Sequence, residues 1–164
     1  MDKSEIVDYY REILTLASNL VPIDWQRLIV GANLDKNDAT SFFFFYSEQE
    51  SPQTFFEGLG IPGKFNIDQS LFDEDIMNIM HKIQALQEWF SKNGQQPFHE
   101  LMIEINSKGA MHSEIGYIDW SGDTNFDDFD QMDFFRYKYL NDVPEDIAAQ
   151  NVLKKMQRYE NKHK

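Results

Sequence analysis

Three features that this chain lacks narrow the classes of protein to which it can belong. It has no cysteine among its 164 residues, which excludes disulfides, thiolate chemistry and zinc sites built on cysteine, and is typical of a reducing compartment. Its start has no apolar run of signal-peptide length, and its most apolar cluster, Phe42 to Tyr46, is far too short to cross a bilayer. We therefore expect a cytoplasmic protein that does not bind membranes.

Basic side chains are also scarce. There are 15 Lys and Arg against 28 Asp and Glu, which gives a formal net charge of −13. Nucleic-acid-binding proteins neutralise phosphates with clustered Lys and Arg, so direct binding to nucleic acid is not expected. An acidic surface suits a basic partner instead, because long-range attraction raises the association rate. Acidity that serves solubility alone is the alternative.

The length fits one domain, residues 1–164, able to bury roughly 70% of its unfolded surface. Hydrophobic periodicity and turn residues predict its elements. In order, they are a helix from Ser4 to Leu20, a β-hairpin of Trp25 to Ala32 and Phe42 to Tyr46 with a turn at Asp35 to Asp38, a long loop from Ser47 to Gln69 with a short strand near Lys64 to Ile67, a helix over about 71–92, a second hairpin of Leu101 to Ile105 and Met111 to Trp120, a short helix capped by Asp127 or Asp128, and a last helix from about Glu145.

This order contains no βαβ unit. It predicts an α+β fold with an antiparallel sheet of about four strands and helices packed mainly on one face. Ser70 with Asp73 approximates a capping box for the long helix. The short helix should direct four apolar side chains inward, namely Phe129, Met132, Phe135 and Tyr139.

Two motifs have the residue spacing of known ligand-binding sites but lack other features that those sites require. Gly58, Gly60 and Gly63 have the spacing of a dinucleotide-binding loop, but Pro62 and the absence of a predicted βαβ unit exclude that reading. The run from Asp119 to Asp130 places oxygen ligands at the spacing of a calcium loop. However, Thr124 stands where the turn needs glycine, and Asp130 is too short for the usual bidentate glutamate. We expect no cofactor and no metal site.

The most informative stretch runs from Tyr117 to Glu145. Between positions 119 and 146, nine carboxylates stand against only two basic side chains, Arg136 and Lys138. Such carboxylates could hold Mg²⁺ in an enzyme, but no basic cluster or histidine accompanies them. The four histidines are scattered along the chain; His99 and His112, on neighbouring strands, could approach each other.

The chain resembles the YezG-like family of immunity proteins, the antitoxins that accompany secreted polymorphic toxins, often nucleases, in Gram-positive bacteria. The resemblance covers nearly the whole chain and rests on the order and spacing of several segments. These are Val21 to Trp25, the Phe-rich strand, Trp89-Phe90, Leu101 to Ile105, Ser107 to Gly109, Tyr117 to Trp120, Phe126, Tyr137 to Tyr139 and Pro144-Glu145. The family pattern has a glycine after the Tyr-Lys-Tyr helix. Here Asn141-Asp142 takes its place, and Asn also adopts the left-handed turn.

The resemblance implies a protein without catalytic activity that binds a cognate toxin domain in the cytoplasm of the producing cell. The shared aromatic residues then define the fold, and partner-specific contacts fall on exposed side chains. The candidate toxin-binding residues are Asp123, Asp127, Asp128, Asp130 and Asp133, with Glu48, Glu50 and Glu57 as a second acidic patch. Their carboxylates would occupy the basic face of a nuclease, where phosphates bind. The alternatives are a metal-dependent enzyme that uses the carboxylates from Asp119 to Asp133 and a general acidic DNA mimic.

Overall fold

The computed structural model describes residues 3–35 and 40–164 of the chain. The turn predicted between the first two strands lies largely outside these residues. In chain order the elements are α1 (Lys3–Ser18), β1 (Trp25–Leu34), β2 (Thr40–Glu48), β3 (Ser51–Glu57), the 3₁₀ turn η1 (Gly58–Gly60), α2 (Ile61–Phe65), α3 (Gln69–Lys92), β4 (Glu100–Asn106), β5 (Met111–Gly116), α4 (Asp128–Leu140) and α5 (Ile147–His163).

The strands form one antiparallel sheet in the order β3-β2-β1-β4-β5. β1 lies at the centre, where Val30 stands opposite Phe44 of β2 and Ile103 of β4. The predicted α+β class and the two predicted hairpins are confirmed. The sheet has five strands where about four were expected, because β3 forms inside the segment predicted as a loop.

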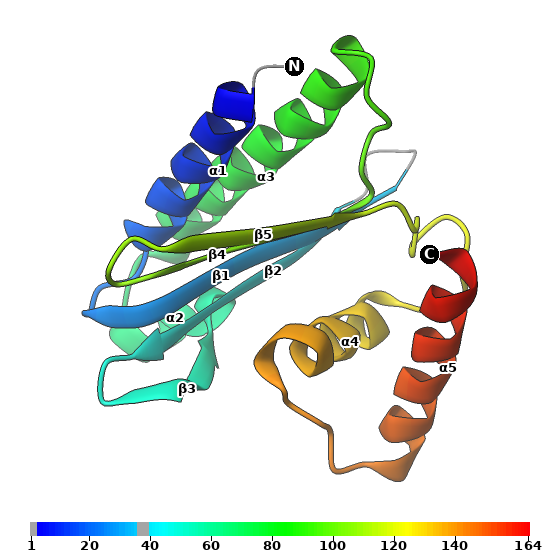
Figure 1. Cartoon of the computed structure of the whole chain (residues 1–164). Helices are drawn as coiled ribbons and strands as arrows, with labels where there is room; N and C mark the ends of the chain where they lie inside the picture. Colours follow the sequence, from blue (N-terminus) through cyan, green and yellow to red (C-terminus); the bar gives the residue numbers. More distant parts are fainter. Residues whose placement is uncertain (1–2, 36–39) are drawn as a thin grey trace.

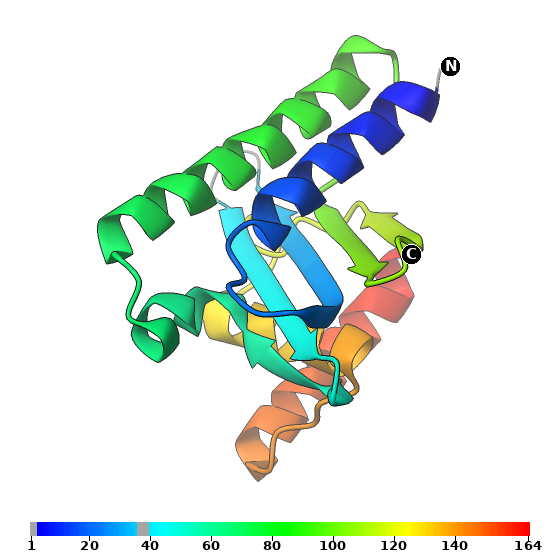
Figure 2. The ribbon, with the colours of Figure 1, turned by 90° about the vertical axis from the view of Figure 1, so that its left-hand side faces the viewer.

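Helices cover both faces of this sheet, so the prediction of helices mainly on one face is wrong. α1 and α3 lie side by side on one face, and α4 lies on the other with α5 packed against it (Figures 1 and 2). The reason is that the inner strands are apolar on both faces. Phe44 and Ile103 point toward α1 and α3, whereas Phe43 and Met102 point toward α4.

The first core fills the space between the sheet and helices α1 and α3. Its fully buried side chains include Ile13 from α1, Ile79 and Ile83 from α3, and Leu28 and Tyr46 from the sheet. Apolar residues recur along α3 at spacings of three and four, which places one continuous stripe against the strands. This core contains most of the chain's buried apolar side chains.

The α4 side has two smaller clusters. The second core joins Ile29, Phe43, Phe45 and Met102 of the sheet to Phe135 of α4, and the Phe135 ring stacks 4.6 Å from that of Phe43. The third cluster holds α5 against α4 and the segment after β5. Its buried members are Ile118, Trp120, Phe134, Leu153 and Met156.

A glycine in β1 sets how closely α4 approaches the sheet. A β-carbon at Gly31 would collide with the ring of Phe135 and lie 2.9 Å from the Leu101 carbonyl oxygen. Glycine is therefore the residue that lets the Phe135 ring lie against β1.

Three local predictions are wrong. The strand expected near Lys64 to Ile67 is replaced by α2, where Pro62 occupies the first turn because it needs no helical partner for its nitrogen. The N-cap of α3 is Asp68, whose carboxylate accepts a hydrogen bond from the Leu71 N–H at 3.0 Å, so Ser70 and Asp73 form no capping box. β5 ends at Gly116, four residues before the predicted end at Trp120.

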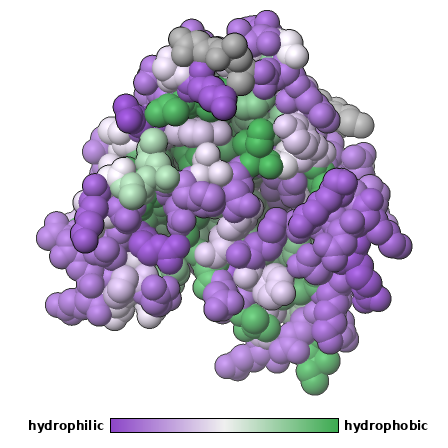
Figure 3. Space-filling model, viewed as in Figure 1, coloured by the Kyte–Doolittle hydropathy of each residue, from purple (hydrophilic) through white to green (hydrophobic). Residues whose placement is uncertain are grey.

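Hydrophilic side chains dominate the face of the molecule seen in Figure 1, with smaller hydrophobic patches among them (Figure 3). Within the described part of the chain, no helix is both long and apolar enough to cross a membrane.

Candidate functional site

The aspartates before α4 build the start of that helix. Asp127 is the N-cap: its Oδ1 accepts the Asp130 N–H at 2.8 Å, and Oδ2 of Asp130 accepts the Asp127 N–H at 3.1 Å. This reciprocal pair is a capping box, and the carboxylates also oppose the positive end of the helix dipole. The predicted cap at Asp127 is confirmed. Both aspartates thus have a structural role.

Asp128 ties the same turn to the sheet. Its Oδ1 accepts a hydrogen bond from the Ser41 hydroxyl of β2 at 2.7 Å. Phe129 was predicted to face inward, and this is wrong: its side chain is 83% exposed. The inward positions of α4 are Gln131, Phe134 and Phe135, from which Phe129 lies at least about 120° away around the helix. An exposed phenyl ring therefore lies among carboxylates.

Asp123 and Asp133 flank this turn. Asp123 is exposed in the loop that joins β5 to α4. Asp133 is half-buried beside Arg136 and Asp142 in a small hollow. Burial raises the pKa of Asp133, and the Arg136 guanidinium opposes that rise. Arg136 is itself bound to Asp142, with Nη2 at 2.8 Å from the carboxylate.

The second predicted acidic patch is not one surface. Glu48 lies 4.0 Å from Nζ of Lys64, and that ammonium lies over the Phe56 ring, which packs against the first core. Glu57 stands opposite Phe45 of the second core and so points to the other face. Glu50 is exposed in the turn between β2 and β3. The structure therefore separates Glu48 from Glu57, and the α4 turn meets β2 at Ser41, the end opposite Glu48.

The carboxylates from Asp119 to Asp133 do not converge. Asp119 is buried, and its Oδ1 accepts the Gly122 N–H at 2.8 Å, whereas Asp127 and Asp130 cap α4. Among residues 3–35 and 40–164, no group of three or more His, Asp or Glu is placed to hold a metal ion. The two strand histidines also stay apart, since His99 bonds the Leu34 carbonyl and His112 pairs with Glu114.

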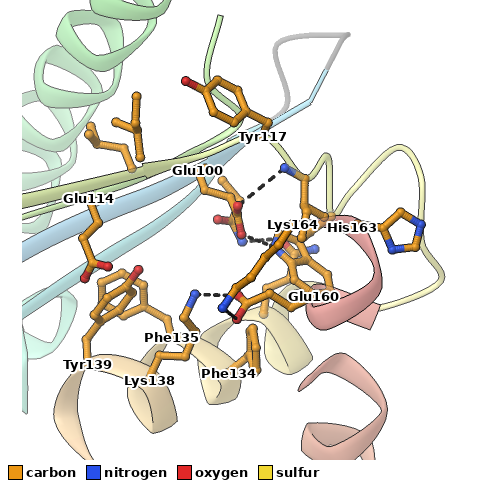
Figure 4. A pocket seen from close by; sticks show the side chains of 17 residues that line it. Glu100, Glu114, Tyr117, Phe134, Phe135, Lys138, Tyr139, Glu160, His163 and Lys164 are labelled. Carbon is orange, nitrogen blue, oxygen red and sulfur yellow. Dashed lines mark hydrogen bonds and ion pairs between the residues drawn. The ribbon is translucent and has the colours of Figure 1, made fainter. Parts of the chain in front are cut away.

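A polar cavity that the sequence did not predict lies between the sheet and the C-terminal helices. We call it the C-terminal cavity. It has a volume of about 370 Å³, and side chains from β4, β5, α4 and α5 converge on it (Figure 4). The charged groups that line it are Glu100, Glu114, Lys138, Glu160 and Lys164.

Glu160, which lines the cavity, pairs with two lysines that also line it. Its side chain is only 7% exposed, and it accepts Nζ of Lys138 at 2.6 Å and lies 3.6 Å from Nζ of Lys164. Burial works against the charged ammonium of Lys138. Nevertheless, the hydrogen bond to Glu160 and the surrounding carboxylates keep the pKa of Lys138 above its ordinary value.

Glu100 has a different environment. Its Oε1 accepts the indole N–H of Trp120 at 2.5 Å, and its Oε2 receives the Ile118 N–H at 3.5 Å. Burial raises the pKa of Glu100, and these hydrogen bonds and Lys138 oppose the rise. A β-carbon at Gly116 would collide with this carboxylate. The Glu100 side chain therefore holds the segment that follows β5, through Ile118 and Trp120, at the point where pairing between β4 and β5 stops.

The sequence carried a weak signal for one of these residues. Leu153, Met156 and Glu160 follow each other at spacings of three and four on the inward face of α5. A charged residue in line with an apolar stripe indicates a buried ion pair. Glu100 gave no such signal, because its partners Ile118 and Trp120 lie in a segment predicted as strand.

Comparison with known proteins gives a consistent result. The family described as "Immunity protein YezG-like" matches residues 6–154. The chain is 21% identical over 150 residues to the type VII secretion system protein EsaG of Staphylococcus aureus, which covers 92% of this chain and 90% of that protein. It is 22% identical over 119 residues to the immunity protein YezG of Bacillus spizizenii, which covers 73% of each.

The match includes every element of the fold, apart from the first residues of α1 and about the second half of α5. It includes the segments on which the resemblance was based, from Val21 to Trp25 through Pro144-Glu145. The asparagine that replaces the family's glycine behaves as predicted, because Asn141 ends α4 with φ 56° and ψ 35°. The chain belongs to the YezG-like family of immunity proteins.

Proposed function

We propose that this chain neutralises a cognate secreted toxin by binding it in the cytoplasm of the producing cell, and that the toxin is a nuclease. The observation that carries the proposal is membership of an immunity protein family across residues 6–154. The chain then acts by binding, without catalysis. The net charge of −13 supports a partner whose active surface is basic, as a surface that holds nucleic acid is.

The acidic turn at the start of α4 is the docking surface that we favour for the basic face of the toxin. Asp127, Asp128 and Asp130 bring three carboxylates together in this turn while each also forms a hydrogen bond that holds the fold, and Asp123 precedes them. Phe129 adds an exposed aromatic ring at the centre of this group. An aromatic anchor surrounded by polar groups is the usual composition of an interface hot spot.

Co-expression tests the function directly. The toxin gene beside this chain's gene should arrest growth of a host when expressed alone, and expression of this chain should restore growth. The two proteins should also purify as one complex. A neighbouring toxin that neither co-purifies nor loses activity would contradict the proposal. Inhibition of unrelated nucleases as well would favour a general DNA mimic.

The aromatic anchor is tested by Phe129→Ala. The exposed ring contributes little to folding, so the melting temperature should not change, while the dissociation constant for the toxin should rise at least about tenfold. Leu71→Ala is the matched control, because Leu71 is 63% exposed in the first turn of α3 on the other side of the molecule. Equal effects of the two substitutions would exclude a specific role for Phe129.

The charge is tested without removing the cap. Asparagine caps a helix about as well as aspartate, so Asp127→Asn, Asp128→Asn and Asp130→Asn together remove three charges and keep the acceptor oxygens. We expect association with the toxin to slow about tenfold at low salt, and the difference to shrink as salt is added. The control neutralises Asp73, Glu74 and Asp75 on α3 in the same way. An unchanged rate at low salt would exclude this turn as a docking surface.

A further inference from the structure

The two edges of the sheet differ in how they are protected. At one edge, β3 carries Pro52, and its pairing with β2 is irregular at Ser47 and Glu48. Both features hinder the addition of another strand. At the other edge, β5 pairs with β4 in continuous register from Met111 to Gly116 and contains no proline or lysine. The outer edge of β5 faces the viewer in Figure 1 and lies at the right in Figure 2.

The face of the sheet toward α1 offers an apolar hollow beside β5. It has a volume of about 190 Å³ and is lined mainly by Val7, Tyr10 and Leu14 of α1 and by Ile103 and Met111 of the hairpin. A strand added to β5 would direct every second side chain toward this face. Aliphatic side chains would fit there.

The opposite face beside β5 holds the C-terminal cavity, where two carboxylates of the described residues form no ion pair with a lysine or arginine. Among the described residues, Glu160 engages both Lys138 and Lys164, and Glu104 is bound to Arg27 at 2.8 Å. Within the described residues, the one ion-pair partner of Glu114 is the His112 imidazole, at 3.5 Å. Glu100 accepts N–H hydrogen bonds from Trp120 and Ile118, and Lys138 acts on it through its charge without forming an ion pair in the described part of the chain.

We propose that β5 is a docking strand, and that an extended segment of the toxin pairs with its outer edge and carries Lys or Arg alternating with apolar residues. This inference rests on the proposed function and adds a second contact to the acidic turn at the start of α4. Backbone hydrogen bonds to β5 supply affinity, and the two flanking sites supply specificity. The basic side chains reach Glu114 and Glu100 beneath the sheet, and the apolar ones fill the hollow beside α1.

The geometry allows this reach. A paired strand lies about 4.8 Å beyond β5, and Glu114 is half exposed and points from β5 toward Tyr139, which also lines the cavity (Figure 4). Lysine and arginine extend their charge on long apolar stems, so they span this distance. The partner is therefore basic, which agrees with the net charge of −13.

Hydrogen exchange of the backbone amides, measured on this chain alone and in complex with the purified toxin domain encoded beside its gene, locates the contact. Alternate N–H groups of β5 point outward, so exchange in Met111–Gly116 should slow at least about tenfold in the complex. The β3 edge, Ser51–Glu57, should not change. A complex that forms while β5 exchanges as in the free chain would overturn this inference and leave the proposed function in place.

Absence of any complex would contradict both proposals. Protection of β5 in the chain alone that increases with protein concentration would show that a second copy occupies this edge, and would also overturn the inference.

Charge reversal gives a second readout. Glu114→Lys should weaken toxin binding at least about tenfold, because like charges then meet across the interface. Glu74→Lys is the control, since Glu74 is exposed on α3 and carries the same change of charge. The melting temperature should stay near that of the unmodified chain for both variants. Equal affinities of the two variants would exclude a cationic side chain at Glu114.

Discussion

The two faces of the sheet are built on different principles. The face toward α1 and α3 is one continuous apolar core, with fully buried side chains from both helices and three strands. The face toward α4 has two small apolar clusters and the C-terminal cavity with its part-buried Lys138–Glu160 pair. This difference indicates that the packing of α1 and α3 on the sheet supplies most of the stability. The side with α4 and α5 carries the exposed acidic turn and the C-terminal cavity.

A pair of alanine substitutions tests this contrast with the largest effect. Ile79 and Met156 are both fully buried, the first in α3 and the second in α5. Ile79→Ala should lower the free energy of unfolding by about 2–5 kcal/mol. Met156→Ala should cost less global stability, because α5 can open locally, and should speed hydrogen exchange in α5 specifically. Equal losses of unfolding free energy in urea denaturation would show that the helices on the two faces of the sheet unfold as one unit.

The part-buried Lys138–Glu160 ion pair gives the next largest effect. Lys138→Met leaves Glu160 buried without its closest cation and should cost about 2–3 kcal/mol, because Lys164 remains 3.6 Å away. Lys92→Met removes an exposed pair with Glu88 and should change stability by less than about 0.5 kcal/mol. Similar losses for both variants in thermal denaturation would show that the burial of Glu160 does not strengthen its pair with Lys138.

The cavity should also give stability a pH dependence. The pKa of Glu100 is raised in the folded state, so the folded protein keeps this proton at pH values where the unfolded chain has lost it. Stability from this group therefore falls as pH rises above the ordinary glutamate value of 4.5. Relative to the unmodified chain, Glu100→Gln should gain stability between pH 4.5 and pH 7, as measured by urea unfolding. A difference that does not vary with pH would be inconsistent with a raised pKa.

The smallest expected effect concerns the start of α4. Asp127→Ala removes the N-cap and should cost about 1 kcal/mol, whereas Asp127→Asn keeps the acceptor and should be nearly neutral. Thermal denaturation of the two variants separates the cap from the charge. An asparagine variant as unstable as the alanine variant would show that the negative charge itself holds the turn.

Local sequence rules predicted the elements whose cause is local. The stripe along α3, the cap at Asp127 and the left-handed Asn141 depend on neighbours within a few residues, and all three predictions are confirmed. The alternation of Leu101 and Ile103 correctly predicted the face of the strand that is turned toward the first core. The same alternation gave no sign that Met102 is buried, because Met102 lies on the other face, which is covered only when α4 packs on it.

The remaining features depend on contacts between distant segments. β3 is held by Phe55 and Phe56, which pack against different cores. Glu100 meets Trp120, and Lys138 meets Glu160, only after the C-terminal helices fold back beneath the sheet. For the candidate site, the sequence located the acidic segment, and the structure shows which of its aspartates also cap or anchor α4.

The central claim is that this chain binds and silences a toxin, and titration tests it most directly. Increasing amounts of the purified chain should be added to a fixed amount of the purified toxin domain encoded by the neighbouring gene, with cleavage of nucleic acid as the readout. The account predicts that cleavage falls in proportion and stops at a fixed stoichiometric ratio, with no change in the chain itself. Undiminished cleavage at a large excess of the chain would contradict it.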